Sequence, residues 1–191
     1  MTSMWTGQRV RLRGIEPEDW EKFREFNADS DIQRKGFVVF PPRSDEVYKA
    51  RAKERAETEQ EADDCEFWLA IESLDEGVLV GSLGTHHVDI RAGRFEYGIG
   101  LGGQYHRRGY ASDAVRLLLA FMFRERRFHK CEAGAWSFNA ASIAFHLGFG
   151  FKEEGRLRDH DFADGRYYDE VLFGMTAEEF AKLYPAPSIL A

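Results

Sequence analysis

Apolar and polar positions follow two different rhythms along the chain. In some segments they alternate, which favours half-buried strands, and in others the apolar positions recur every three or four residues, which favours amphipathic helices. The alternating segments, where we expect strands, are 9–15, 67–73, 77–90, 93–101, 130–138, 154–163 and 167–176. The helical pattern covers 16–27, 44–64, 112–127, 139–151 and 176–183. Strands and helices therefore both contribute to the fold, which we expect to be of the α/β class.

The order of these elements limits the topology. The strands between 67 and 101 are joined by hairpin-length connections, so we expect them to be antiparallel. A helix at 112–127 then separates the strands 93–101 and 130–138, and this order of strand, helix and strand predicts a right-handed parallel unit. The pair Asp164–Gly165 gives a strong hairpin signal between the last strands.

Residues 28–43 carry no periodic pattern. They combine Gly36, Pro41 and Pro42 with the apolar run Phe37–Phe40, so we expect a loop rather than a regular element. Loops of this length beside a binding site are often lids. We therefore expect this segment, with the charged helix that follows it, to shape a substrate pocket.

Composition and charge narrow the possible functions. The chain has 191 residues, 43% of them hydrophobic, which suits one domain over residues 1–191. A formal net charge of -7 argues against a general nucleic-acid binder, which would show a clustered excess of Lys and Arg. No apolar run of the sequence approaches the roughly 20 residues that span a bilayer, so we expect a cytoplasmic protein without a membrane partner. Cys65 and Cys131 lie outside any CxxC pattern, so neither a disulfide framework nor a zinc site is expected.

A glycine-rich basic loop joins the strand 93–101 to the helix at 112–127. Such a junction usually holds a phosphate, because the N–H groups of the first helical turn lack partners and the helix dipole favours an anion. Gly98, Gly100 and Gly103 satisfy GxGxxG, but the helix does not begin at the third glycine and no strand ending in a ribose-binding acid follows. The spacing therefore argues against a dinucleotide-binding fold, and the absence of GxxxxGK(S/T) excludes a nucleoside-triphosphatase loop.

The loop also contains the pattern HxxGxA, formed by His106, Gly109 and Ala111. Gly109 permits an unusual backbone angle and a close approach of phosphate oxygens, and Ala111 is small enough to pack beside a diphosphate. Arg107 and Arg108 add positive charge. This pattern resembles the pyrophosphate loop of the GNAT acetyltransferase superfamily, Q/R-x-x-G-x-G/A, with His106 in place of Gln or Arg. Backbone amides make most contacts in such loops, so we expect this difference to matter little; the alternative is a structural turn with solvent-facing arginines.

The chain downstream of the loop resembles the RimJ/RimL and spermidine acetyltransferase branches of that superfamily. Those branches carry an NxxS pattern, matched by Asn139 and Ser142, then a GF pair and a DGR turn, matched by Gly150–Phe151 and Asp164–Arg166. The match covers residues 94–175, whereas the preceding strands and helices agree only in their order. The resemblance implies the GNAT fold, a mixed and mostly antiparallel sheet of about seven strands with a central splayed parallel pair, flanked by helices.

The resemblance also implies acetyl-CoA as cosubstrate and no metal. Backbone groups at the end of the strand before the loop would pair with pantetheine, and the loop would hold the diphosphate. The residues expected to bind the cosubstrate are Ile99, Gly100, Leu101, His106, Arg107, Arg108, Gly109, Tyr110, Ala111, Ser112, Asn139 and Ser142. His86 and His87 are a weak metal suggestion, because neighbours on a strand point to opposite faces and would not easily share one ion.

Acetyl transfer from a thioester needs a proton acceptor for the amine and a proton donor for the departing thiolate. Glu96 is the expected general base, acting directly or through water, and the alternative is a solvated strand carboxylate. His146 stands where many family members carry a tyrosine that protonates the thiolate, and a histidine can donate a proton near neutral pH. The alternative is a half-buried helix histidine with a backbone partner, in which case Ser142 would contact the thiolate or the pantetheine.

These features together predict an acetyl-CoA-dependent N-acetyltransferase that acts on a primary amine by direct attack in a ternary complex. The acceptor is left open between a protein N-terminal amine and a small amine such as a polyamine or an aminoglycoside, and the acidic balance mildly favours a cation. A non-catalytic acyl-CoA-binding sensor is the alternative if Glu96 and His146 face away from the thioester. A homodimer is implied only by the resemblance.

Overall fold

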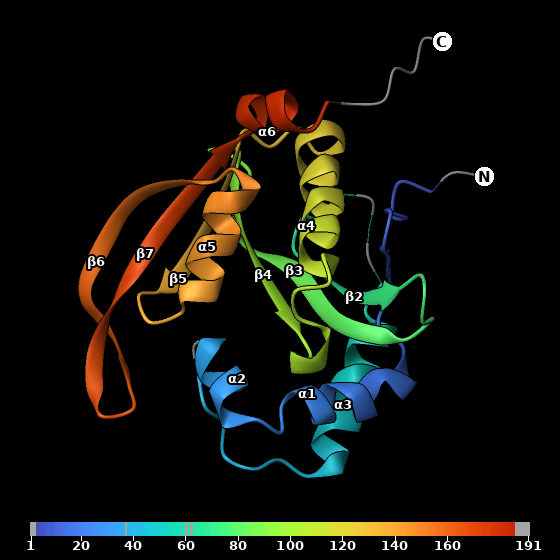
Figure 1. Cartoon of the computed structure of the whole chain (residues 1–191). Helices are drawn as coiled ribbons and strands as arrows, with labels where there is room; N and C mark the ends of the chain where they lie inside the picture. The colour runs from blue at the N-terminus through green and yellow to red at the C-terminus, as the bar shows by residue number, and fades with distance from the viewer. Residues whose placement is uncertain (1–2, 37, 60, 62, 186–191) are drawn as a thin grey trace. The chain divides into compact units, whose positions relative to one another are not determined.

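The computed structural model describes residues 3–36, 38–59, 61 and 63–185 (Figure 1). Phe37, part of the expected lid, lies outside the described residues. The strands are β1 (Val10–Arg13), β2 (Trp68–Ser73), β3 (Leu79–Asp89), β4 (Arg94–Leu101), β5 (Lys130–Trp136), β6 (Lys152–Ala163) and β7 (Arg166–Thr176). The helical elements are η1 (Pro17–Asp19), α1 (Trp20–Phe26), α2 (Ser30–Lys35), α3 (Asp45–Glu57), η2 (Gly103–Tyr105), α4 (Tyr110–Ala120), η3 (Phe121–Glu125), α5 (Ala140–Phe149) and α6 (Ala177–Leu183).

The strands form a seven-stranded mixed sheet in the order β1-β2-β3-β4-β5-β7-β6. β4 and β5 run parallel, with a register from Arg94 opposite Lys130 to Glu96 opposite Glu132. The pairs β1–β2, β2–β3, β5–β7 and β6–β7 are antiparallel. The expected α/β fold, a mostly antiparallel sheet with a parallel pair and flanking helices, is therefore confirmed. Within the described residues, no helix combines the length and apolarity needed to cross a membrane.

The chain divides into two compact units, the first formed by Met1–His86 with Tyr97–Leu118 and the second by His87–Glu96 with Leu119–Ala191. In the first unit, α1 packs against α3 (Figure 1). α3 is charged along most of its length and buries Ala52, so its other faces are solvated as its sequence predicts. The buried core of this unit includes Val10, Ile71, Leu83, Ala114, Val115 and Leu118.

The second unit is built on β5 and the long β6–β7 hairpin (Figure 1). Asp164 and Gly165 at the hairpin turn both have a left-handed backbone, with φ of 49° and 80°, which is the geometry that an Asp-Gly turn predicts. α6 begins with a capping box in which Thr176 Oγ1 accepts from the Glu179 N–H and the Glu179 carboxylate accepts from the Thr176 N–H. The buried core of this unit includes Cys131, Ala135, Phe149, Phe173, Met175 and Phe180.

Several expected element boundaries are wrong, and the helix expected over 44–64 ends at Glu57. The segment expected to be a loop contains α2, because the carboxylate of Asp29 accepts from two of the first N–H groups and so caps a short helix. α4 begins at Tyr110 rather than at Ser112, since Gly109 O already accepts from the Asp113 N–H. The earlier start of α4 places the glycine of the loop directly before the helix.

Candidate active site

The loop between β4 and α4 has the backbone of an anion cradle. Arg107 and Gly109 have positive φ angles of 60° and 80°, and left-handed residues of this kind occur where successive amides form anion-binding concavities. α4 begins at the next residue, so the N–H groups of Tyr110, Ala111 and Ser112 have no partner within the helix. The structure therefore brings the expected loop residues together at a helix N-terminus, which is a favourable place for a phosphate.

The loop rests on the turn between β2 and β3. Tyr110 is buried, and its hydroxyl donates to Asp75 Oδ1 at 3.0 Å. Hydrogen bonds from Ser73 and then from Tyr110 lower the pKa of Asp75, so this carboxylate is charged at neutral pH. Arg108 forms an ion pair with Glu76 in the same turn. The side chains of Tyr110 and Arg108 therefore fix the position of the loop, and Tyr110 offers a ligand only its backbone N–H.

Asp113 fastens the first turn of α4 to the start of β1. Its carboxylate accepts from the N–H groups of Arg9 and Val10, at 2.7 and 3.1 Å, and from Arg116 at 2.7 Å. Burial alone would raise the pKa of Asp113, but the hydrogen bonds from Arg116 and the two amides lower it overall. The buried carboxylate is therefore charged, and its place in the first turn also suits the helix dipole.

The end of β4 and His106 meet on the other side of the loop. His106 Nε2 lies 3.3 Å from Leu101 O, so the exposed ring is turned back towards β4. Ile99 and Leu101 are half-buried, and Gly100 is exposed. Binding through the backbone amides of the loop, rather than through the His106 ring, stays a prediction. Pairing of the β4 backbone with pantetheine stays a prediction.

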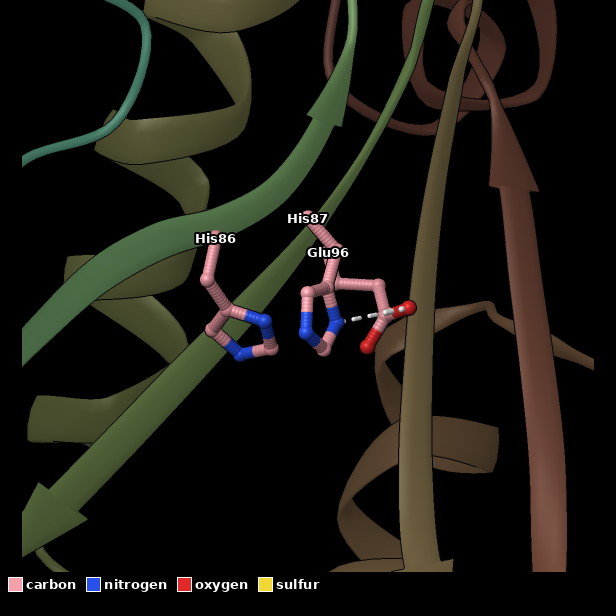
Figure 2. A group of neighbouring side chains, drawn as sticks. All are labelled: His86, His87 and Glu96. Atoms are coloured by element: carbon pink, nitrogen blue, oxygen red, sulfur yellow. Dashed lines mark ion pairs between the residues drawn. The ribbon is translucent and has the colours of Figure 1, made fainter.

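Glu96, the expected base, is half-buried and has an imidazole beside it. His87 Nδ1 lies 3.3 Å from Glu96 Oε1 (Figure 2). The side chain of His87 is 75% exposed, whereas that of Glu96 is 33% exposed. This partner of Glu96 does not follow from residue spacing, which suggests His86 and His87 only as possible metal ligands.

His87 also corrects the argument about metals. Its φ of 49° is left-handed, which breaks the alternation of side chains along β3. Ligand atoms of His86, His87 and Glu96 lie within 4.8 Å of one another (Figure 2). A similar group comprises His160, Asp161 and Glu170. The expectation that His86 and His87 point apart and would not easily share one ion is therefore wrong, and the expected absence of a metal stays a prediction.

Asn139 and Ser142 lie at the start of α5 in the second unit. Asn139 Oδ1 accepts from the Ser142 N–H at 3.2 Å and so caps the helix. Ser142 Oγ lies 3.4 Å from His146 Nδ1, one helical turn later. The asparagine of the NxxS pattern therefore has a structural role as the helix cap, and the hydroxyl of the serine lies beside His146.

His146 is packed among aromatic rings and is only 5% exposed. Its ring is stacked on Phe173, with centroids 4.9 Å apart and planes inclined by 9°. His146 Nδ1 lies 2.8 Å from Ser142 O, so this nitrogen carries the proton that the carbonyl accepts. Burial lowers the pKa of His146, and the hydrogen bond to Ser142 O opposes only part of that effect. The imidazole is therefore neutral at neutral pH, which favours a packing role over proton donation by an imidazolium.

Glu170 in β7 is a carboxylate that the sequence analysis did not single out. It covers Gly134 of β5, where a Cβ would collide with the Glu170 carboxylate. Burial and then the charge of Asp161 raise the pKa of Glu170, and the charge of Glu96 acts in the same direction. Gly134 and Glu170 are far apart in the sequence, so only the register of β5 and β7 reveals this arrangement.

Comparisons with known proteins agree with these features. The acetyltransferase (GNAT) domain family matches residues 9–152. The SPbeta prophage-derived uncharacterized N-acetyltransferase YokL of Bacillus subtilis is 36% identical over 176 residues, which cover 92% of this chain and 94% of YokL. The uncharacterized N-acetyltransferase p20 of Bacillus licheniformis is 28% identical over 183 residues, covering 95% of this chain and 99% of p20. Spermidine N-acetyltransferase from Vibrio cholerae, solved in complex with CoA and spermine, has the same fold, with a TM-score of 0.76, 20% identity and coverage of 90% of this chain and 97% of that one.

The family match spans well over half of the chain, and YokL matches nearly all of it. The chain therefore belongs to the GNAT acetyltransferase family and is an N-acetyltransferase.

Proposed function

We propose that this N-acetyltransferase takes its acetyl group from acetyl-CoA and transfers it to a primary amine by direct attack within a ternary complex. Acetyl-CoA is the donor that the GNAT family uses. The observation that carries the proposal is the left-handed backbone of Gly109 directly before α4, because such a junction presents amides to a diphosphate.

The donor would be held mainly by backbone groups. Diphosphate oxygens accept from the N–H groups of Tyr110, Ala111 and Ser112, and the positive end of the α4 dipole adds to the attraction. The pantetheine pairs with the backbone of Ile99–Leu101 in the manner of an added strand. One of those amides donates to the thioester carbonyl and stabilises the negative charge that develops on its oxygen.

Glu96 is the proposed proton acceptor. The nitrogen that attacks is in its neutral form. As it bonds to the acetyl carbon and the bond to sulfur breaks, it loses a proton to the Glu96 carboxylate, directly or through water. His87, 3.3 Å from that carboxylate, then returns the proton to solvent. His87 and Glu96 both belong to the second unit, and the proposed proton transfer gives the exposed histidine a role beside the carboxylate.

The departing thiolate is assigned to Ser142 and His146. Ser142 donates a hydrogen bond to the sulfur, and the thiolate takes its proton either from His146 or from water. The lowered pKa of His146 favours water, with the imidazole positioning Ser142 through their contact at the start of α5. A pH profile of kcat separates these sources of the proton.

For the acceptor we propose a cationic small amine such as a polyamine, one of the acceptors that the resemblance to the RimJ/RimL and spermidine acetyltransferase branches leaves open. The electrostatic interaction of Glu96 with Glu170 supports this, because a cation would relieve the repulsion between the carboxylates. A net charge of -7 acts in the same direction. The Vibrio cholerae enzyme of the same fold was solved with spermine, a polyamine.

The test is thiol release from acetyl-CoA across a panel that contains spermidine, spermine, an aminoglycoside and peptides with free N-termini. Initial rates measured while both substrates vary should give intersecting reciprocal plots, which indicate a ternary complex. Parallel plots would instead indicate an acetyl-enzyme intermediate and would overturn direct attack. Acetyl-CoA binding without thiol release for any amine would support the sensor alternative.

A further inference from the structure

Arg9, the residue before β1, lies on the glycine of the donor loop. Its Cδ and Nε are each 3.2 Å from the position that a Cβ on Gly109 would occupy, and its Cζ is 3.9 Å from it. The rest of the side chain is exposed to solvent. The guanidinium therefore lies at the surface of the loop, although the two residues are separated by most of the first unit in sequence.

The backbone holds Arg9 in this position. The Arg9 N–H donates to Asp113 Oδ2 at 2.7 Å, and the Asp113 N–H donates to Gly109 O at 3.1 Å. Buried Asp113 therefore binds the backbone of both Arg9 and Gly109. On its other side, Arg9 O accepts from the Leu74 N–H at 2.9 Å. A cation on an anchored backbone loses less freedom on binding a ligand than one on a free loop.

Charge distinguishes Arg9 from Arg108. Arg108 is already paired with Glu76, so part of its charge is compensated before any ligand binds. Among the residues that the structure describes, no carboxylate forms an ion pair with Arg9. The Asp113 carboxylate is occupied by the backbone amides and by Arg116. Arg9 therefore presents a guanidinium beside Gly109 that no described carboxylate pairs with.

We propose that Arg9 is a phosphate-binding residue of the donor site and that its guanidinium binds the diphosphate held by the loop around Gly109. The inference rests on the proposed use of acetyl-CoA. A guanidinium offers several N–H groups in one plane and matches two phosphate oxygens, whereas the amides of the loop each supply one hydrogen bond. The residue before β1 thereby contributes to a site that the loop sequence alone would assign to residues 106–112.

Calorimetry with acetyl-CoA and with 3′-dephospho-CoA tests the assignment. Arg9→Gln keeps the backbone amide that Asp113 binds and removes the charge. We expect it to raise the Kd of both ligands about tenfold, as the loss of one charge-assisted hydrogen bond predicts, and the loss should shrink at high salt. Arg11→Gln is the matched control, because Arg11 is a nearby exposed arginine, two residues further along in β1, that pairs with Glu72. It should change Kd less than twofold, about the scale of a surface charge.

Three results would overturn the proposal. If Arg9→Gln binds both ligands as tightly as Arg11→Gln does, Arg9 is not a phosphate-binding residue. If only the ligand with a 3′-phosphate is weakened, Arg9 binds that phosphate instead of the diphosphate. If the unchanged protein binds neither ligand, or if Gly109→Val binds both normally, the proposed use of acetyl-CoA at this loop fails as well. Thermal unfolding of each variant confirms that the fold is retained.

Discussion

The loop before α4 and the start of α5 are two candidate sites that differ in the groups proposed to act. At the loop, the groups proposed to bind the donor are backbone amides, and the side chains of Tyr110 and Arg108 contact Asp75 and Glu76 and hold the loop in place. At α5, the candidate groups are the side chains of Ser142 and His146, and the latter is enclosed by aromatic rings. Backbone conformation controls the first site, whereas burial and proton position control the second.

This difference predicts which substitutions matter. A site made of amides should tolerate changes of exposed side chains and should be sensitive to a Cβ at Gly109. A site made of side chains should lose chemistry when an ionisable group is replaced and should keep its affinity for the donor.

Glu96→Gln should lower kcat about 10²- to 10⁴-fold, because it removes the proposed proton acceptor while it preserves the shape of the side chain. Affinity for acetyl-CoA should stay within about twofold, since the donor is assigned to the backbone. Glu132→Gln is the matched control, because Glu132 lies opposite Glu96 in β5 and pairs with Arg94. Equal losses in both variants, measured by steady-state kinetics, would show a general effect of charge instead of a base.

Gly109→Val should raise the Kd of acetyl-CoA about 5- to 150-fold. The left-handed backbone of Gly109 is strained for a β-branched residue, by about 1–3 kcal/mol, and the added side chain would crowd Arg9. Gly165→Val is the control, because Gly165 has the same φ of 80° in the hairpin turn of the second unit and open space around it. Calorimetry that shows undiminished affinity in a folded Gly109→Val protein would reject the loop as the donor site.

His146→Phe should change kcat less than about threefold if the imidazole is a packing group, compared with the larger factors typical of a positioned general acid. If the imidazolium were the donor, kcat of the unchanged enzyme would fall as pH rises through the lowered pKa, and that limb would vanish in the variant. A loss of about a hundredfold with such a change in pH profile would restore the general-acid role.

The same variant also tests the lowered pKa through stability. The pKa of His146 is lower in the folded chain than its ordinary value of 6.5, which applies to the unfolded chain. Its stabilising effect is therefore complete above that pH and is lost as pH falls through the lower folded value. His146→Phe should cost about 1 kcal/mol at neutral pH, for the lost hydrogen bond to Ser142 O, and the difference from the unchanged protein should shrink in acid. Denaturant unfolding at several pH values measures this; a constant difference would contradict it.

Features that depend on local sequence patterns could be predicted, whereas contacts between distant residues could not. The sheet and the loop were predictable, because strand alternation and the spacing of His106, Gly109 and Ala111 are local patterns. Asp29 could have revealed α2 as a cap, but the surrounding glycine and prolines outweighed it. The environments of His146 and Glu170 were not predictable, since Phe173 and Gly134 meet them only through the register of the strands.

Two details of the site can be seen only from the backbone conformation and could not be predicted from the sequence. Alternation along a strand predicted that His86 and His87 would diverge, and the left-handed φ of His87 reversed that conclusion. The contact of Arg9 with Gly109 depends on Asp113, which binds a strand to a helix across a large separation in sequence. Neither feature follows from residue types at fixed spacing.

The smallest expected effect belongs to His106, the residue at which the loop departs from the Gln or Arg of similar proteins. Its ring is exposed and lies 3.3 Å from Leu101 O, so it contacts the end of β4, and the proposed ligand contacts belong to the amides that follow. His106→Ala should therefore raise the Kd of acetyl-CoA less than about threefold, the scale of one exposed hydrogen bond. His106→Gln should match the unchanged protein. A tenfold loss in His106→Ala that His106→Gln repairs would show that the side chain itself binds the donor, and the contrast between an amide-built and a side-chain-built site would no longer hold at this loop.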